Sequence, residues 1–317
     1  MKKINPAQVD LIDALVAEYD IGGLSAAILE KDIHVTDALS AMMQIKHPKI
    51  NLIFCGGTSL SKAFGVIERM SEDIDIKIDI KPLAHLTTSA RKTYLSNYKE
   101  KIKSTLTHLG FVENTKMADA NNANHLFSME WQYQSEYQSE SSLRPHLRIE
   151  VKTCEIACPT EQKEIGYLAE KLAGIDKSVI LTPCQAIEET LAEKVISFLR
   201  RYDRAIYLGE KWDSALIRHF YDVFCITSNN TEIVKKSQSC FPALIASDVK
   251  EYGNQHSSFK LDPFKTLLIS LNKAEIDPTL ASDYQEKLIP LVLGDIKPSF
   301  TEVRTRFSEI ARALLSH

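Results

Sequence analysis

The chain is 317 residues long, with 44% hydrophobic and 25% charged residues and a formal net charge of −4 at pH 7. It is long enough to form two domains with their own cores, and its composition is that of an ordinary globular protein in water. No apolar run approaches the ~20 residues of a membrane-spanning helix, and the net negative charge disfavours indiscriminate coating of nucleic acid.

The N-terminal residues and the cysteines bear on where the protein works. Met1–Pro6 carries two lysines without the apolar core of a secretory signal, so we expect no such signal. The six cysteines are scattered, and only Cys154 and Cys158 lie close together, with nothing nearby to complete a zinc site. Free thiols are typical of a reducing compartment. We therefore expect a cytoplasmic protein.

A glycine pair follows the first strand-like segment. Residues 51–55 form a short apolar run that stops at Gly56 and Gly57, as expected of a buried strand that ends in a turn. Thr58 or Ser59 is then the predicted N-cap of a helix. Free backbone N–H groups at such a helix start suit an anionic phosphate. The alternative is a turn that only reverses the chain.

Two aspartates follow on a second predicted strand. Residues 71–78 alternate, so the isoleucines should face a core while Asp73 and Asp75 project together from the other side. Neighbouring carboxylates repel each other, and Mg²⁺, which binds carboxylates together with phosphate oxygens, would remove that repulsion. A solvated polar strand face is the alternative interpretation.

A third acid lies on a later predicted strand. Residues 146–152 also alternate, which places Glu150 on the polar face. In metal-assisted phosphoryl transfer a third carboxylate can share a second metal or accept the proton of the attacking hydroxyl. Equally, Arg148 or Lys152 can make Glu150 one member of an ordinary ion pair.

Two segments are locally basic. Residues 91–103 form a predicted helix with two tyrosines, and residues 200–204 contain three arginines. Either segment can hold a phosphate backbone. A lysine-rich helix face is also commonly plain solvent-exposed surface.

The motifs in their order resemble a family. Gly56-Gly57-Thr58-Ser59-Leu60-x-Lys62 and Arg69-x-Ser71-x-Asp73-x-Asp75 are similar to the AbiEii/AbiGii-type nucleotidyltransferases, toxin components of bacterial toxin–antitoxin and phage-abortive systems. Glu193-Lys194 with the following Arg200-Arg201, and Arg218-His-Phe-Tyr-Asp222, also resemble that family. The gap between Arg201 and Arg218 is longer than in tighter versions of the motif. The resemblance covers roughly residues 28 to 312.

The resemblance implies a role for each matching residue. Asp73 and Asp75 would bind the metal, Mg²⁺ or Mn²⁺, and Lys194 and Asp222 would join the catalytic set, to which the strand pattern of residues 146–152 adds Glu150. Lys62, on the predicted first helical turn, and Lys194 would balance charge on the leaving pyrophosphate. Either Glu150 or Asp222 would order the acceptor or take its proton. The residues expected to bind the nucleoside triphosphate are Gly56, Gly57, Thr58, Ser59, Lys62, Arg69 and Ser71. Without the resemblance, Lys194 would be a lysine on the solvent-exposed face of a helix, and Asp222 would be a member of a structural ion pair.

The expected fold is α+β. We predict an α/β-type nucleotidyltransferase core with a mixed sheet and N-terminal helices at residues 1–175. A mainly α-helical C-terminal domain at residues 176–317 would complete the active site. No internal repeat or low-complexity tail interrupts this organisation.

The acceptor is left open by the residues themselves. The resemblance implies transfer of a nucleoside monophosphate to RNA, above all to the 3′ end of tRNA, which would block translation and growth. It also implies a separately encoded antitoxin that need not touch this chain. The alternatives are transfer to a protein or a small molecule, and a non-catalytic nucleotide-binding partner in a regulatory complex.

Overall fold

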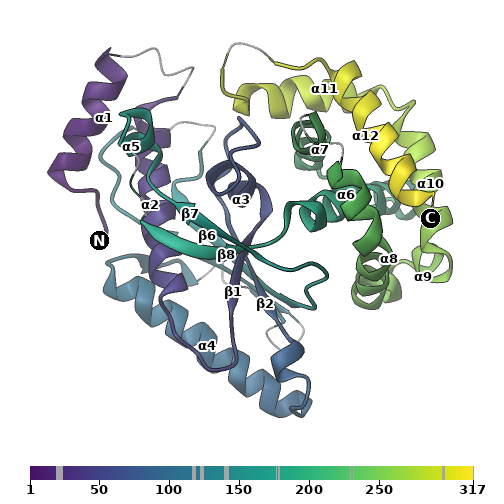
Figure 1. The fold of residues 1–317 in the computed structure, drawn as a ribbon, viewed down its shortest axis with the longest axis horizontal. Helices are drawn as coiled ribbons and strands as arrows, with labels where there is room; N and C mark the ends of the chain where they lie inside the picture. Colours follow the sequence, from purple (N-terminus) through teal and green to yellow (C-terminus); the bar gives the residue numbers. More distant parts are fainter. Residues whose placement is uncertain are drawn as a thin grey trace. The chain divides into compact units, whose positions relative to one another are not determined.

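The computed structural model forms two compact units, which we describe separately (Figure 1). The sheet unit comprises Met1–Gly65, Met70–Ile156 and Thr160–Cys184, and the helical unit comprises Val66–Arg69, Ala157–Pro159 and Gln185–His317. The predicted division fell after residue 175, whereas the sheet unit continues to Cys184. The structure describes residues 1–18, 24–115, 119–121, 125–138, 143–175, 177, 179–228, 230, 232–294 and 297–316.

Helices and strands mix along the sheet unit. Its helices are α1 (Pro6–Glu18), α2 (Ala26–Met43), α3 (Gly56–Lys62), α4 (Thr88–His108) and α5 (Leu168–Leu172). Its strands are β1 (Leu52–Cys55), β2 (Ile74–Asp79), β3 (Val112–Glu113), β4 (Asp119–Asn121), β5 (Leu126–Gln132), β6 (His146–Cys154), β7 (Glu161–Ile165) and β8 (Ile180–Cys184).

The described strands form one mixed sheet. Its order is β3-β5-β6-β2-β1-β8-β7, with β4 paired to β5. The central strand β2 pairs antiparallel with β1 and parallel with β6, and β1 pairs parallel with β8. The predicted α+β class with a mixed sheet is therefore confirmed.

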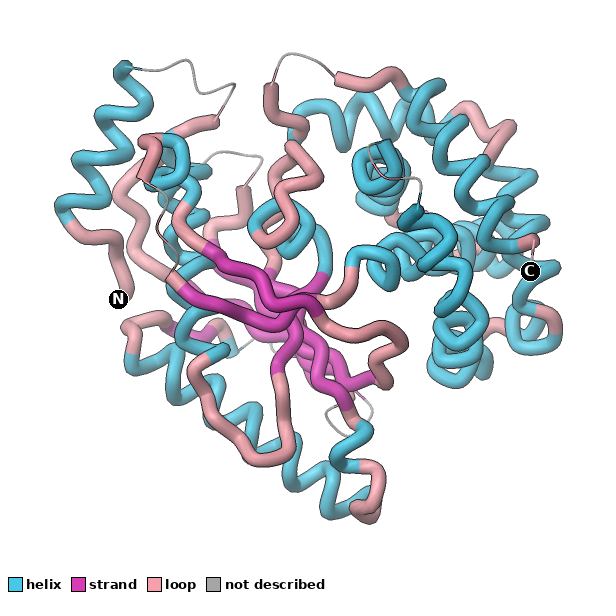
Figure 2. Tube along the Cα trace, in the orientation of Figure 1, coloured by secondary structure: helices cyan, strands magenta, loops and turns pink. Residues whose placement is uncertain are grey.

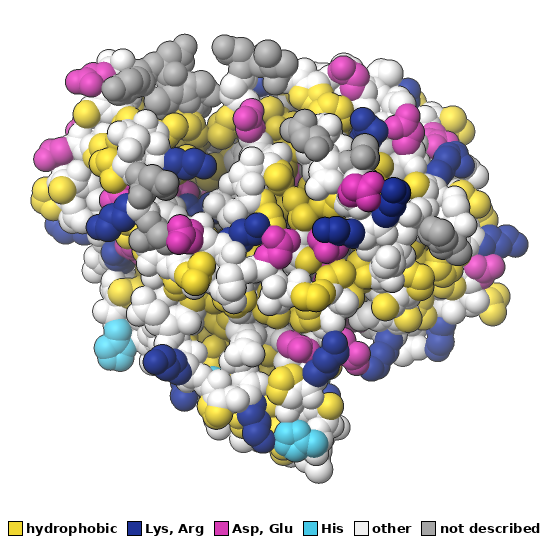
Figure 3. All heavy atoms as spheres, in the orientation of Figure 1, with side chains coloured by type: hydrophobic (Ala, Val, Ile, Leu, Met, Phe, Trp, Pro, Cys, Tyr) yellow, Lys and Arg dark blue, Asp and Glu magenta, His cyan; other side chains and the backbone are white. Residues whose placement is uncertain are grey.

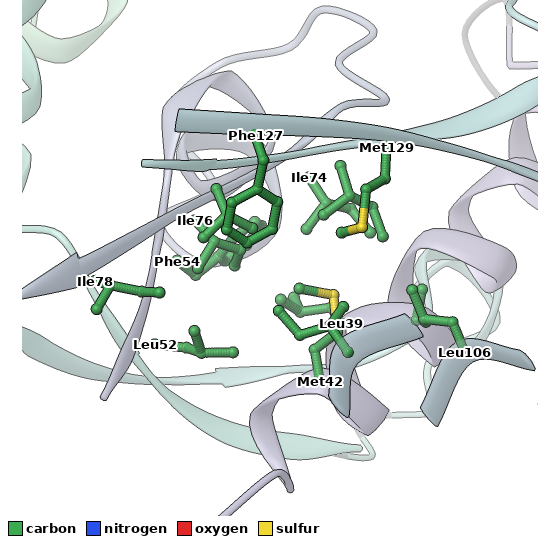
Figure 4. Packing of buried hydrophobic residues seen from close by; sticks show 14 of the residues in the cluster. Leu39, Met42, Leu52, Phe54, Ile74, Ile76, Ile78, Leu106, Phe127 and Met129 are labelled. Carbon is green, nitrogen blue, oxygen red and sulfur yellow. The ribbon is translucent and has the colours of Figure 1, made fainter. Parts of the chain in front are cut away.

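The core of the sheet unit lies on one face of the central strands. Ile74, Ile76 and Ile78 of β2 are buried, as are Leu147, Ile149 and Val151 of β6. Figure 4 shows side chains of α2 and α4 packed with those of the strands in the same cluster. The predicted alternation of both strands is confirmed, and their polar positions are left for the opposite face.

The helical unit contains no strand among its described residues apart from an isolated bridge between Arg69 and Val292 (Figure 2). Its central helix α6 packs against α7, α8 and α10. Phe198 of α6, Phe220 and Phe307 form an aromatic cluster in its core. The helices are α6 (Ile187–Leu208), α7 (Arg218–Ser228), α8 (Glu232–Tyr252), α9 (Ser257–Leu261), α10 (Pro263–Ala274), α11 (Thr279–Asp283) and α12 (Phe300–Leu315). The predicted helical C-terminal region is confirmed.

The described helices and the surface charges agree with what the composition predicts. None of the described helices combines the length and the apolar character that crossing a bilayer requires. On the face drawn in Figure 3, basic and acidic side chains are interspersed. Such a surface favours local recognition over non-specific binding to a polyanion.

Candidate functional site

The glycine turn joins β1 directly to α3. Gly56 has φ +76°, which lets the chain pass from strand to helix with Cys55 as the N-cap residue. The prediction of an N-cap at Thr58 or Ser59 is therefore wrong. A positive φ at Gly56 makes a separate turn unnecessary, so the helix begins three or four residues earlier than predicted. As a result Lys62 lies in the last turn of α3, not in the predicted first turn.

Asp75 lies directly over this turn. It pairs with Cys55 in the antiparallel register of β1 and β2. A Cβ atom built on Gly56 would lie 2.0 Å from Asp75 Oδ2. A side chain at position 56 would therefore have to displace the Asp75 carboxylate, and the glycine lets the backbone of α3 approach it. The structure thus brings two of the predicted site elements together.

Two of the three predicted acids lie on adjoining strands, and the third comes just before one of them. Asp75 and Glu150 are register partners in the parallel pair of β2 and β6, and Asp73 immediately precedes β2. Partners in neighbouring strands project from the same face of a sheet. Sequence spacing had placed the first two acids together, and the register adds the third.

In the structure arginines engage two of these carboxylates. Arg144 forms an ion pair with Asp73, and Arg148 forms one with Glu150 along the same strand. No group of three or more His, Cys, Asp or Glu side chains is gathered as a metal site in the described part of the chain. The oxygen donors nevertheless suit a hard cation such as Mg²⁺, which takes one or two carboxylates together with phosphate oxygens and water. Asp75 and Asp73 are the residues that would hold it.

The hydroxyl residues tie α3 to the segment before β2. Thr58 Oγ1 donates to the backbone oxygen of Asp73 at 2.5 Å and lies 3.0 Å from Ser71 Oγ. Ser59 is buried, and its hydroxyl lacks a hydrogen-bond partner in the described part of the chain. Thr58 and Ser71 therefore fix the backbone that carries Asp73.

Lys62 is held inside the sheet unit. Its ammonium forms an ion pair with Asp32 of α2 and donates to the backbone oxygen of Gly166 at 3.3 Å. Asp32 also accepts from the backbone N–H of Leu168 at 2.8 Å. This network joins α2, α3 and α5. Nothing in it supports the predicted contact of Lys62 with a phosphate.

Three predicted residues meet inside the helical unit. Asp222 is fully buried and accepts from Arg69 Nε and Nη2, each at 2.7 Å, while Lys194 Nζ lies 2.5 Å from Asp222 Oδ2. Burial alone would raise the pKa of Asp222, but the adjacent charges of Arg69 and Lys194 hold it well below its ordinary value. Two cations face one acid, so this buried trio carries a net positive charge.

Two further arginines of the motif form ion pairs within the helical unit. Arg200 Nε lies 2.5 Å from Asp248, and Arg201 Nη2 lies 2.8 Å from Asp213. Arg218 begins α7.

In the other basic segment, at residues 91–103, Tyr98 is buried in the core, so that side chain is not available to stack on a base.

Sequence reasoning missed two partners of the site. Arg144, which binds Asp73, lies outside every motif and precedes its strand by two residues. The pairing of Asp32 with Lys62 joins residues that are 30 positions apart. No local periodicity marks either contact, because both depend on how distant elements pack.

Comparison with known proteins identifies the family. The family model described as nucleotidyl transferase AbiEii toxin, type IV toxin–antitoxin system, matches residues 37–306. Among solved structures, the chain is similar to MenT4, a nucleotidyltransferase toxin from Mycobacterium tuberculosis H37Rv. The TM-score is 0.37 at 15% sequence identity, over 68% of this chain and 71% of that chain. No curated protein sequence matches the chain. The family match covers most of the sequence, and the chain belongs to the AbiEii family of nucleotidyltransferase toxins of type IV toxin–antitoxin systems.

Proposed function

We propose that the protein transfers a nucleoside monophosphate from a nucleoside triphosphate to the 3′ end of tRNA and thereby blocks translation and growth. The observation that carries this proposal is the carboxylate of Asp75 packed against Gly56, with Glu150 beside it in the sheet. Membership of a nucleotidyltransferase family supports the reaction type. The acceptor hydroxyl attacks the α-phosphorus, the bond to the β-phosphate oxygen breaks, and pyrophosphate leaves.

The carboxylates of Asp73 and Asp75 would supply the negative charge that holds a metal ion beside the triphosphate. Mg²⁺ or Mn²⁺, held by Asp73 and Asp75, would neutralise the triphosphate and polarise its phosphoryl oxygens. The backbone N–H groups at the start of α3 have no partners within the helix and can face phosphate oxygens. Thr58 and Ser71 keep the turn and the β2 entry in a fixed geometry. Positioning and charge neutralisation are the main contributions that phosphoryl transfer asks of a protein.

Glu150 is the better candidate for accepting the proton of the acceptor hydroxyl. Its side chain is 36% exposed and pairs with Arg148. Asp222, in contrast, is buried between Arg69 and Lys194, and its lowered pKa makes it a weak base. We therefore assign Asp222 and Arg69 as positioning residues. The Asp222 carboxylate pairs with both cations and so fixes the Lys194 ammonium within the helical unit.

An antitoxin is the implied protein partner. The family belongs to type IV toxin–antitoxin systems. We propose a separately encoded antitoxin that need not contact this chain. Co-expression is then expected to restore growth even where the two proteins do not co-purify.

Gly56→Ala should separate the role of the turn from ordinary backbone strain. The new Cβ would force the Asp75 carboxylate away, since the two cannot occupy positions 2.0 Å apart. Gly65→Ala is the matched control, because Gly65 also has positive φ, +62°, but open space around it. Both variants should lose about 1–2 kcal/mol of stability through φ. Only Gly56→Ala should lose transfer as well, measured as nucleotide incorporation by each folded variant.

Transfer itself is tested with labelled nucleotides. The purified protein is incubated with Mg²⁺, each α-³²P nucleoside triphosphate in turn, and total RNA or cell protein, and the products are run on denaturing gels. Label on a tRNA-sized band supports the proposal and names the base. Label on protein or on a small molecule would show that this molecule, and not tRNA, is the acceptor. Nucleotide binding without pyrophosphate release under any acceptor would indicate a binding-only role.

A further inference from the structure

A pocket of about 380 Å³ lies within the helical unit along one face of α6. Its α6 residues are spaced three and four apart, so they share one helical face. Gly209 ends α6 with φ 64°, and residues 210–213 after it line the same pocket. The charged lining residues are Arg200, Arg201, Arg204, Glu210, Lys211 and Asp213.

One arginine forms a fixed wall of this pocket. The guanidinium of Arg200 lies 3.8 Å from the centre of the Tyr252 ring, and its Nε lies 2.5 Å from Asp248. Its side chain is only 6% exposed. Stacking and pairing together fix the position and the orientation of the guanidinium.

The other cations are less firmly held. Arg201 pairs with Asp213 at 2.8 Å, and Arg204 pairs with Glu210. The two acids are 47% and 46% exposed, and exposed ion pairs of this kind contribute little to stability. Lys211 forms no ion pair with any residue that the structure describes. The lining cations outnumber the lining acids by four to two.

Arg204 has a donor that no described residue satisfies. Its Nε is buried and lacks a hydrogen-bond partner in the described part of the chain, although its terminal nitrogens contact Glu210 and Gln255. A buried donor without a partner is unfavourable unless a ligand or water supplies the acceptor. The guanidinium fork matches phosphate oxygens in geometry and charge.

We propose that this pocket binds backbone phosphates of the acceptor RNA, and that Glu210 and Asp213 occupy the phosphate positions until the RNA displaces them. The proposal rests on the proposed function, since it takes the acceptor to be RNA. Arg200 and Arg204 are about 6 Å apart along the axis at 1.5 Å per residue. That separation is more than a single phosphate group needs, so the pocket suits a polynucleotide better than a free anion.

Direct binding tests the pocket without depending on transfer. A fluorescein-labelled single-stranded RNA with the 3′ sequence of tRNA is titrated with each protein, without nucleoside triphosphate, over a range of salt. Arg201→Ala with Lys211→Ala should weaken binding about tenfold. The slope of log K against log[salt] should become less steep by about 1.4, from two phosphate contacts at ~0.7 each. Glu210→Gln with Asp213→Asn should tighten binding, because the competing carboxylates are gone.

The controls change the same charges elsewhere in the helical unit. Arg306→Ala and Glu309→Gln alter an exposed pair on α12, 3.4 Å apart, and should leave RNA affinity unchanged. The proposal is overturned if the acid variants bind RNA no more tightly, because Glu210 and Asp213 would then be structural partners only. It is also overturned if RNA affinity is constant while millimolar inorganic phosphate changes Trp212 fluorescence, which would identify a free-anion site.

The RNA-binding assay and the transfer assay test the two proposals separately. If the gel assay labels protein while RNA affinity still follows the pocket variants, the proposed tRNA acceptor is wrong and the phosphate site stands. If tRNA is labelled while none of the pocket variants changes RNA affinity, the proposed function stands and this inference is wrong.

Discussion

Asp75→Asn should abolish nucleotide transfer while leaving the fold intact. The substitution keeps the shape of the side chain above Gly56 but removes the negative charge that would hold the metal and the triphosphate. Loss of one such electrostatic group costs on the order of 10²–10³ in rate, and loss of a metal ligand is expected to cost more. The measurement is incorporation of α-³²P nucleotide per enzyme, with Asp73→Asn tested beside it.

Asp79→Asn is the matched control for this prediction. Asp79 lies on the same strand at the same alternation as Asp75, and its carboxylate accepts from the backbone N–H of Lys81 at 3.0 Å. It should transfer at the wild-type rate. Circular dichroism and thermal unfolding establish that all variants are folded. Full activity in both Asp73→Asn and Asp75→Asn would refute the metal assignment.

Asp222→Asn should give the largest loss of stability among the site variants. It leaves the buried charges of Arg69 and Lys194 without their counter-charge. Breaking one side of a buried ion pair costs about 3–5 kcal/mol. Asp213→Asn removes an exposed partner of Arg201 in the same unit and should cost no more than about 1 kcal/mol. Denaturant unfolding of both variants measures the difference, and equal small losses would show that Asp222 is not the counter-charge.

The stabilising effect of Asp222 should also depend on pH. Its pKa in the folded chain is lower than in the unfolded chain because of Arg69 and Lys194. A carboxylate of this kind contributes stability that is fully present above its unfolded pKa, about 3.9, and is lost as the pH falls toward the folded value. The gap in unfolding free energy between wild type and Asp222→Asn should therefore be constant from pH 5 to 7 and shrink below about pH 4. A gap that does not shrink there would contradict the assignment.

Local patterns carried much of the site. The alternation of residues 71–78 and 146–152 predicted that Asp73, Asp75 and Glu150 would lie on the polar side of two strands. Burial of the intervening aliphatic residues confirms the alternation, although Asp73 immediately precedes the strand β2. Alternation is reliable here because side chains of a strand point to opposite faces every second residue. The order of the motifs was also sufficient to identify the family.

Contacts between segments that are distant in the sequence could not be predicted from those local patterns. The register that sets Asp75 beside Glu150, and the ion pair of Arg144 with Asp73, depend on sheet pairing between segments about 70 residues apart. The start of α3 was misplaced because the sequence does not reveal that Gly56 adopts positive φ beneath Asp75.

By itself, then, the sequence determined the reaction class, the polar faces of the strands and the helical C-terminal region, since these follow from periodicity and ordered motifs. Only the tertiary structure decided which partner each charged side chain has. It places Asp222 between Arg69 and Lys194, where the two cations hold its pKa below the ordinary value despite burial. It also ties Lys62 to Asp32. The strength of a charge depends on its neighbours and on its exclusion from water, and distant segments supply both.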